Sequence, residues 1–166
     1  MPMSPDLVTA TYDSPLGSIL LAASDQGLAG LWFEGQRHWP LASASWREYT
    51  AHTVLTETRH QLDAYFAGTR LAFNLPLDLS IGTAFQSRVW QALCAIPAGV
   101  TQSYAAVAAR LGAPRAARAI GAAVGRNPVS IVVPCHRVLG AAGTLTGYAG
   151  GLERKAALLR LEGAWA

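Results

Sequence analysis

The chain has 166 residues and a mass of 17.5 kDa, enough for one large domain or two small ones. Hydrophobic residues make up 51% and charged residues 14%, which excludes intrinsic disorder because disorder requires low hydrophobicity and high charge. The net charge of +3 is unevenly divided, with −4 on residues 1–80 and +7 on residues 81–166. A basic C-terminal half is typical of a protein that binds nucleic acid, although chance segregation of surface charge gives the same numbers.

The two cysteines, Cys94 and Cys135, are too few for a disulfide scaffold, and no CxxC or clustered His/Cys pattern indicates a zinc site. The N-terminus lacks the basic start and apolar run of a signal peptide. The longest uncharged stretch, 89–109, contains Pro97, Gly99 and several polar residues, which is untypical of a membrane span. We therefore expect a cytoplasmic protein with reduced thiols and no membrane, metal or cofactor.

The first half of the sequence predicts β structure followed by a helix. Its short apolar runs are separated by the turn sequences Ser14-Pro15-Leu16-Gly17 and Asp25-Gln26-Gly27, a pattern typical of an antiparallel meander. From residue 52 onward, apolar residues recur at helical spacing, and Gly68 ends this segment. In chain order we expect three strands, a surface connection, a helix and a further strand, at 7–12, 18–23, 28–33, 40–50, 52–67 and 71–77.

Beyond residue 80 the pattern is helical. Thr83 is suited to cap a helix that stops near Pro97, and Ser103 is suited to cap a short helix. After Gly112, Pro114 fits the first turn of a second helix, so the two short helices predict a helix-turn-helix. The remaining expected elements are the end of the short helix near Leu111, the end of the second helix near Val124, a strand at 131–133, a loop at 140–151 and a last helix at 152–161.

The second helix of this motif, 115–125, is rich in alanine and glycine. A helix that reads base edges in the major groove offers Asn, Gln, Arg or Lys at several positions. Here small side chains favour close approach of the backbone to DNA, with Arg118 as a candidate probe. Tight helix–helix packing, which alanine and glycine also serve, remains the alternative interpretation.

Cys135 is a candidate nucleophile, because it precedes two basic residues and nearby cations lower the pKa of a thiol. In an extended strand His136 points away from the sulfur, so a bridging water would link the two and a carboxylate would hold the imidazole. The only acids in this half are Glu153 and Glu162, and a folded-back chain brings Glu162 to His136. The alternative, a buried small hydrophobe, is the role that we assign to Cys94.

Residues 134–138, Pro-Cys-His-Arg-Val, resemble the active-site signature of the O6-alkylguanine-DNA alkyltransferases, the methylated-DNA–protein-cysteine methyltransferases. The likeness covers essentially all of residues 80–163 in order and spacing, and it is loose in the N-terminal half. Further matching segments are Thr83-Ala84-Phe85-Gln86, Ile96-Pro97-Ala98-Gly99, Ser103-Tyr104, Ala116-Ala117-Arg118-Ala119-Ile120-Gly121, Asn127-Pro128, Thr146-Gly147-Tyr148-Ala149-Gly150-Gly151, Arg154-Lys155 and Leu161-Glu162-Gly163.

The resemblance implies an α+β fold of the bacterial single-function type. Residues 1–80 would form a small α/β support domain with an antiparallel, ribonuclease-H-like sheet. Residues 81–166 would form a mainly helical, winged-helix-like domain that contains the helix-turn-helix and the alkyl acceptor. The more acidic support domain is expected to face away from DNA.

The resemblance also implies direct repair of O6-alkylguanine, and of O4-alkylthymine, in duplex DNA by a monomer that reacts once. Tyr104 would promote rotation of the damaged nucleotide and Arg118 would take its place in the stack. Cys135 would attack the alkyl carbon while Glu162, His136 and a water take the thiol proton. The other implied residues are Asn127 beneath the cysteine, Ala117, Ala119 and Gly121 at the DNA, and Tyr148, Ala149, Val138 and Pro134 around the substrate.

Two departures from the family pattern concern the pocket, because Ser130 and Ala149 stand where some relatives carry Pro and Ser. Ala149 offers no hydroxyl, which leaves the range of accepted alkyl groups open. One alternative function is a non-catalytic protein that binds alkylated DNA, although such relatives replace the acceptor cysteine. A Cys/His hydrolase is the other, and it would need an oxyanion hole that the sequence does not mark.

Overall fold

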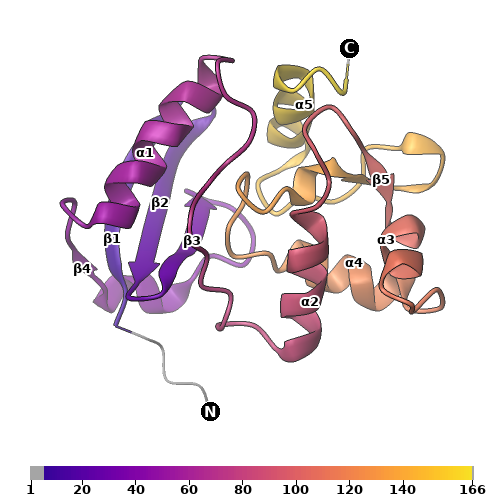
Figure 1. Cartoon of the computed structure of the whole chain (residues 1–166), viewed down its shortest axis with the longest axis horizontal. Coiled ribbons are helices and arrows are strands. Elements are labelled where there is room, and N and C mark those ends of the chain that lie inside the picture. Colours follow the sequence, from indigo (N-terminus) through magenta and orange to yellow (C-terminus); the bar gives the residue numbers. More distant parts are fainter. Residues whose placement is uncertain (1–5, 166) are drawn as a thin grey trace.

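Antiparallel pairing organises the N-terminal half of the computed structural model, which describes residues 6–165 (Figure 1). The sheet order is β3-β2-β1-β4, with β4 parallel to β1 and the other pairs antiparallel. Helix α1 packs across β1, β2 and β3. The bounds are β1 Val8–Ser14, β2 Gly17–Ser24, β3 Gly27–Phe33, β4 Arg47–Glu48 and α1 Thr53–Phe66. The predicted meander and helix are confirmed. Strand β4 lies inside the expected surface connection and was not predicted, because a strand of two residues is too short to show an alternating apolar pattern.

Strand β3 is buried along its whole length because both of its faces are covered. Leu31 and Phe33 belong to the main core, while Trp32 lies in a small cluster on the opposite face, where its ring packs at a tilt against Trp46 with centroids 5.8 Å apart. A β-carbon at Gly30 would come within 1.9 Å of the Trp32 ring, so that position requires glycine.

Residues 81–165 form four α-helices and a two-stranded parallel sheet. Thr83 forms a capping box with Gln86 at the start of the first of these helices, and the Ser103 hydroxyl accepts from the Ala106 N–H, so both predicted caps are confirmed. The bounds are α2 Ala84–Leu93, β5 Gln102–Ser103, α3 Tyr104–Arg110, α4 Ala117–Gly125, β6 Val138–Leu139 and α5 Leu152–Leu161, with short 3-10 turns at Leu41–Ser45, Cys135–Arg137 and Ala141–Gly143.

Two predicted strands are wrong. Segment 71–77 meets β3 only through a bridge between Leu28 and Leu77, because the Gln61 side chain takes the Asn74 N–H and carbonyl instead of a neighbouring strand. Segment 131–133 is a local turn in which Val133 N donates to Val129 O. Pro114 also lies in the turn before α4 rather than in its first turn.

One hydrophobic core runs through both halves. Leu31 N donates to Pro128 O at 2.8 Å, and Ser130 N donates to Leu31 O at 3.1 Å. Arg154 of α5 donates to Leu16 O and stacks 4.6 Å from the Phe33 ring centroid. These contacts fix the loop that precedes Cys135 against the sheet. Within residues 6–165, no helix is both long and apolar enough to cross a membrane.

Candidate active site

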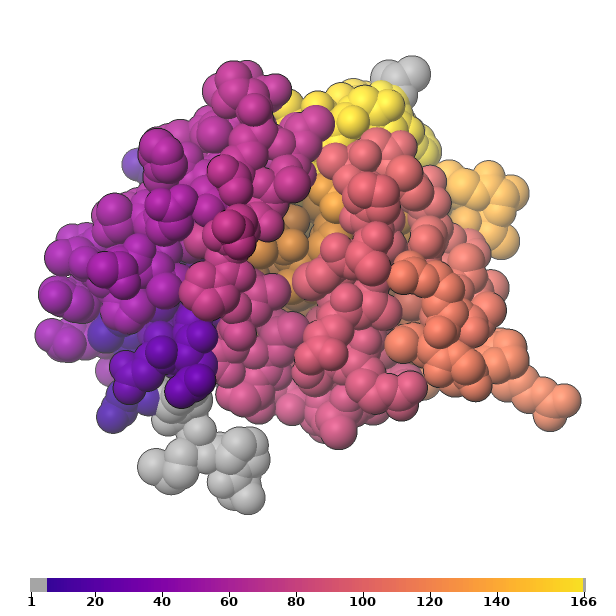
Figure 2. Space-filling view, viewed as in Figure 1, coloured from indigo at the N-terminus to yellow at the C-terminus, as the bar shows by residue number. Residues whose placement is uncertain are grey.

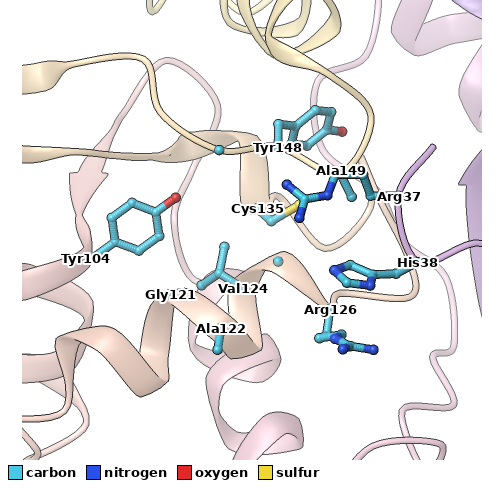
Figure 3. Close-up of a pocket in the computed structure, with 12 residues that line it drawn as sticks. Arg37, His38, Tyr104, Gly121, Ala122, Val124, Arg126, Cys135, Tyr148 and Ala149 are labelled. Atoms are coloured by element: carbon cyan, nitrogen blue, oxygen red, sulfur yellow. The ribbon is translucent and has the colours of Figure 1, made fainter.

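A cavity of about 370 Å³ opens beside α4 and reaches the Cys135 side chain (Figure 3). In the close-up, Tyr104 lies on one side of the cavity and Arg37, His38 and Arg126 on the other. The lining residues are Arg37, His38, Tyr104, Gly121, Ala122, Val124, Gly125, Arg126, Cys135, Gly147, Tyr148 and Ala149. Two of them, Arg37 and His38, come from the N-terminal half, so both halves of the chain contribute side chains to the cavity.

The Cys135 thiol is the only cysteine sulfur at this cavity, and the residue is 6% exposed. Burial raises the pKa of the thiol, and a hydrogen bond with Asn127 and the charge of Lys155 only partly oppose this effect. The thiol is therefore protonated at neutral pH, and its use as a nucleophile requires a base.

Asn127 holds the loop that leads to the cysteine. Its Nδ2 donates to Val133 O at 2.8 Å, and its Oδ1 accepts from Val129 N at 3.0 Å. Between these two anchors Ile131 has a φ of 72°, a left-handed conformation that is unusual for a β-branched residue. The local hydrogen bonds of Asn127 thus stabilise a strained turn beneath Cys135.

His136 and Glu162 form the buried pair that the sequence suggested. His136 Nε2 lies 2.8 Å from Glu162 Oε2, because Glu162 caps the C-terminal end of α5 and this end packs against the Cys135–Arg137 turn. The extended strand expected at His136 is absent, since a 3-10 turn carries the residue. Burial lowers the pKa of His136, and the bond to Glu162 opposes it.

A neutral imidazole that donates Nε2–H to Glu162 keeps an acceptor lone pair on Nδ1. This Nδ1 atom is buried and has no hydrogen-bond partner among residues 6–165. His136 is therefore arranged to receive a proton on the nitrogen that faces away from the carboxylate.

The Glu162 carboxylate has two further partners that the sequence did not assign. Arg137 donates from Nε to Oε1 and from Nη2 to Oε2, both at 2.8 Å. Tyr65 of α1 donates its hydroxyl to Oε2 at 2.6 Å. Burial opposes ionisation of Glu162, but these bonds and the bond to His136 outweigh it and lower its pKa to about 2.

Lys155 is fully buried, and no role was assigned to it from the sequence. Its Nζ donates to three carbonyls, those of Val138, Thr146 and Gly147, at 2.6–3.0 Å. Burial lowers its pKa to about 8, and the nearby Cys135 opposes this. The sequence could have indicated that Lys155 is buried, because it lies on the same face of α5 as Ala156 and Leu159, which are buried.

The predicted substrate pocket is assembled only in part. Tyr148 and Ala149 line the cavity, and the Tyr148 hydroxyl is buried without a hydrogen-bond partner among residues 6–165. Val138 and Pro134 do not line it. Val138 lies in the core on β6, and Pro134 faces a separate hollow, because the Cys135–Arg137 turn reverses the chain between them.

The residues expected at DNA lie along α4. Arg118 and Ala119 are exposed, Ala117 and Gly121 are partly exposed, and Gly121 alone of these borders the cavity. The Gly121 backbone comes close to Tyr104, since a β-carbon there would lie 3.8 Å from the ring. The side of α4 that lines the cavity therefore carries only small side chains, those of Gly121, Ala122, Val124 and Gly125.

Cys94 is exposed, so its interpretation as a buried hydrophobe is wrong. It caps the C-terminal end of α2, where Leu93 and Ile96 on either side point into the core instead. Cys94 lines the hollow between segment 71–77 and residues 94–98. In Figure 2 orange residues of the C-terminal half are visible at the bottom of a hollow between the magenta and pink surfaces.

The fold and site together define a protein with a buried cysteine thiol at a cavity beside a helix-turn-helix. The model of the 6-O-methylguanine DNA methyltransferase DNA-binding domain matches residues 84–164, and that of the ribonuclease-like domain matches residues 7–79. Methylated-DNA–protein-cysteine methyltransferases from Mycobacterium leprae and Methanosarcina acetivorans are 50% identical over 152 residues and 46% identical over 154 residues. These alignments cover 92% and 93% of this chain and 90% and 97% of the relatives.

Solved structures give the same result. The O6-methylguanine methyltransferase of Mycobacterium tuberculosis superposes with a TM-score of 0.86 at 46% identity, over 96% of this chain and 94% of that chain. The Mycobacterium tuberculosis OGT in complex with DNA superposes with a TM-score of 0.85 at 46% identity, over 95% of this chain and 93% of that chain. The chain belongs to the 6-O-methylguanine DNA methyltransferase family. It is a DNA-binding methyltransferase of DNA repair, with the predicted α+β fold.

Proposed function

We propose that this protein repairs O6-alkylguanine in duplex DNA by transferring the alkyl group irreversibly to Cys135. The observation that carries the proposal is the buried thiol at the end of a cavity beside α4, adjacent to the His136–Glu162 pair. The DNA complex of the Mycobacterium tuberculosis relative supports DNA as the partner.

The transfer is a displacement at the alkyl carbon. The Cys135 sulfur forms a bond to this carbon, the bond from carbon to guanine O6 breaks, and its electron pair stays on the guanine. The thiol proton passes through a water to His136 Nδ1, while the ionised Glu162 stabilises the resulting imidazolium. Tyr104, whose hydroxyl remains protonated because burial raises its pKa, donates a proton to guanine N3.

The damaged nucleotide reaches the thiol by rotating out of the duplex. The cavity is too deeply placed for a base that stays stacked, since Cys135 is buried at its inner end. Tyr104 at the cavity wall favours the rotation, and the exposed Arg118 on α4 fills the gap left in the stack. Ala117, Ala119 and Gly121 allow the α4 backbone to approach the minor groove. O4-alkylthymine presents a similar exocyclic alkyl ether and is a second substrate.

Two cationic side chains at the cavity mouth, Arg37 and Arg126, bind the flanking phosphates, while His38 between them is neutral because burial and the two arginines lower its pKa. Arg37, His38 and Arg126 are exposed, and none of them forms an ion pair with an acid within residues 6–165. Arg37 is held in place from the C-terminal half, because its N–H donates to Ala149 O at 3.0 Å. The Arg126→Ala variant should reduce the salt slope of DNA binding by about 1, and Arg59→Ala on α1 should leave it unchanged.

Each molecule reacts once, because a thioether is stable and no second thiol borders the cavity in residues 6–165. The protein acts as a monomer in the cytoplasm, where thiols stay reduced. Residues 1–80 support the site, and residues 81–166 bind DNA and accept the alkyl group.

The decisive experiment incubates the protein with duplex DNA that contains O6-methylguanine and measures the intact protein mass. We expect one burst of one methyl group per protein, located on Cys135. Cys135→Ala should bind the duplex without gaining mass, and Cys94→Ala should react like the wild type. Transfer by Cys135→Ala, or repeated turnover by the wild type, would contradict the proposal. Binding without any adduct in the wild type would identify a non-catalytic DNA-binding protein instead.

A further inference from the structure

The Glu162 carboxylate receives one hydrogen bond from outside the helical half of the molecule. Tyr65 lies on α1, 97 positions before Glu162 in the chain, and its hydroxyl donates to Oε2 at 2.6 Å. Tyr65 is fully buried, and its ring packs against Phe66 and Phe73 at centroid distances of 5.3 and 5.2 Å. The hydroxyl is therefore held in one position by aromatic packing.

Three donors converge on the same carboxylate oxygen. Oε2 accepts from Tyr65 Oη, His136 Nε2 and Arg137 Nη2, at 2.6, 2.8 and 2.8 Å. A carboxylate oxygen has two lone pairs, so these donors share its electron density. The bond from Tyr65 is shorter than the bond from His136, so it leaves less of the electron density of Oε2 for the hydrogen bond from His136.

We propose that Tyr65 is a positioning residue for alkyl transfer, whose hydroxyl fixes the Glu162 carboxylate and limits the strength of its hydrogen bond to His136. The inference rests on the proposed role of His136 as proton acceptor. It gives the sheet half of the molecule a direct part in setting the reactivity of a site that the helical half contains.

The direction of the effect follows from the charges around the imidazole. His136 faces Glu162 and Lys155 at α5, Arg137 on its own turn, and the neighbouring Cys135, while Tyr65 reaches it through Glu162. The Tyr65 hydroxyl stays protonated, because burial and the negative Glu162 raise its pKa. Its removal leaves a more basic carboxylate, which stabilises the imidazolium and raises the pKa of His136.

The test is Tyr65→Phe, which keeps the ring and removes only the hydroxyl. Transfer requires neutral His136, so the acidic limb of the rate–pH profile should move upward by about 0.5 pH units. NMR titration of the His136 ring in unreacted protein should move in the same direction. The chain has four histidines, and the His136 signal is the one lost in His136→Gln.

Tyr12→Phe is a matched control, because Tyr12 Oη donates to Asp63 Oδ1 at 2.7 Å and Asp63 also lies on α1. This variant removes an exposed tyrosine–carboxylate bond that does not involve Glu162, and it should leave both the profile and the His136 titration unchanged. Replacement of Tyr65 by 3-fluorotyrosine keeps the hydroxyl and makes it a stronger donor. It should move both midpoints downward, and it remains a test if Tyr65→Phe does not fold.

An unchanged profile and titration in Tyr65→Phe, with only a lower melting temperature, would overturn the proposal and leave Tyr65 as a packing residue. Failure of the proposed function looks different, because wild-type protein would then transfer no alkyl group. The NMR titration still tests Tyr65 in that case, since it requires no transfer.

Discussion

The two halves of the molecule bury different kinds of side chain. Among residues 6–80, the sheet half buries one charged residue, Asp78, whose carboxylate accepts from the hydroxyls of Ser24 and Ser80. The helical half buries Arg137, Lys155 and Glu162. Both halves share one apolar core, so this contrast is not a difference in hydrophobicity.

The contrast shows which half must supply hydrogen-bond partners for buried charges. Removing a charge from water costs several kcal/mol unless partners replace the lost hydration. Glu162 has four donors and Lys155 has three carbonyl acceptors, so the helical half compensates each of these charges locally. Over its described residues, the sheet half has only the buried charge of Asp78 to compensate. Its contribution to the helical half is apolar packing and the hydrogen bond from the Tyr65 hydroxyl to Glu162.

The largest effect should follow from Glu162→Gln. Loss of the charge leaves Arg137 buried without its counter-ion and should lower the free energy of unfolding by about 4 kcal/mol in urea titrations. Single-turnover transfer should slow at least about 100-fold, because His136 loses the anion that stabilises its protonated form. The matched change Asp78→Asn should cost about 1 kcal/mol and leave transfer unchanged. Equal losses in the two variants would remove the contrast between the halves.

Truncation of the sheet-half core should affect stability alone. Leu55 is fully buried near the start of α1, three turns from Tyr65. Leu55→Ala should lower the free energy of unfolding by about 3 kcal/mol. The rate of transfer, measured well below the melting temperature, should equal that of the wild type. A slower rate would mean that packing in the sheet half reaches the site by more than Tyr65.

Acidification should weaken the fold mainly through Glu162. Its pKa is lowered from 4.5 to about 2, so the ionised carboxylate contributes stability above pH 4.5 that is lost as the pH falls toward 2. The loss should be on the order of 3 kcal/mol. Burial opposes ionisation of Asp78, but hydrogen bonds from Ser24 and Ser80 still lower its pKa. Ionised Asp78 therefore also stabilises the fold, and this stability is lost as the pH falls. Urea unfolding at several pH values should show a flatter acid slope in Glu162→Gln than in Asp78→Asn.

The smallest effect should come from Thr83→Ala, which removes the capping box of α2 inside the helical half. We expect a loss of about 1 kcal/mol in the free energy of unfolding. Transfer should stay unchanged, because Thr83 touches neither the cavity nor the buried charges. Impaired transfer in this variant would show that the whole helical half, rather than its charged cluster, determines reactivity.

Local rules predicted much of the fold. The meander, α1, α5 and the caps at Thr83 and Ser103 follow from turn residues, period and side-chain hydrogen bonds within a few positions. The strands expected at 71–77 and 131–133 failed for a nonlocal reason. Their apolar residues serve the interface between the halves, where side chains and local turns satisfy the backbone instead of a ladder.

The site was predictable where residues are adjacent or part of the recognised signature, as for Cys135, His136 and Glu162. Tyr65 was not, because its role depends on a contact across 97 positions. Arg37 and His38 reach the cavity for the same reason, through the packing of the two halves. Cys94 was misplaced because a helix end turns its last residue outward, although its neighbours are apolar.

Strand β3 lies at one end of the sheet, and an edge strand offers unpaired backbone groups to other chains. Here Pro76 and Leu77 cover one part of that edge, and Pro128 and Val129 cover another. The loop that presents the cysteine therefore also shields the sheet from intermolecular strand pairing. Loosening of this loop would expose the backbone groups of β3 to pairing with a strand of another chain.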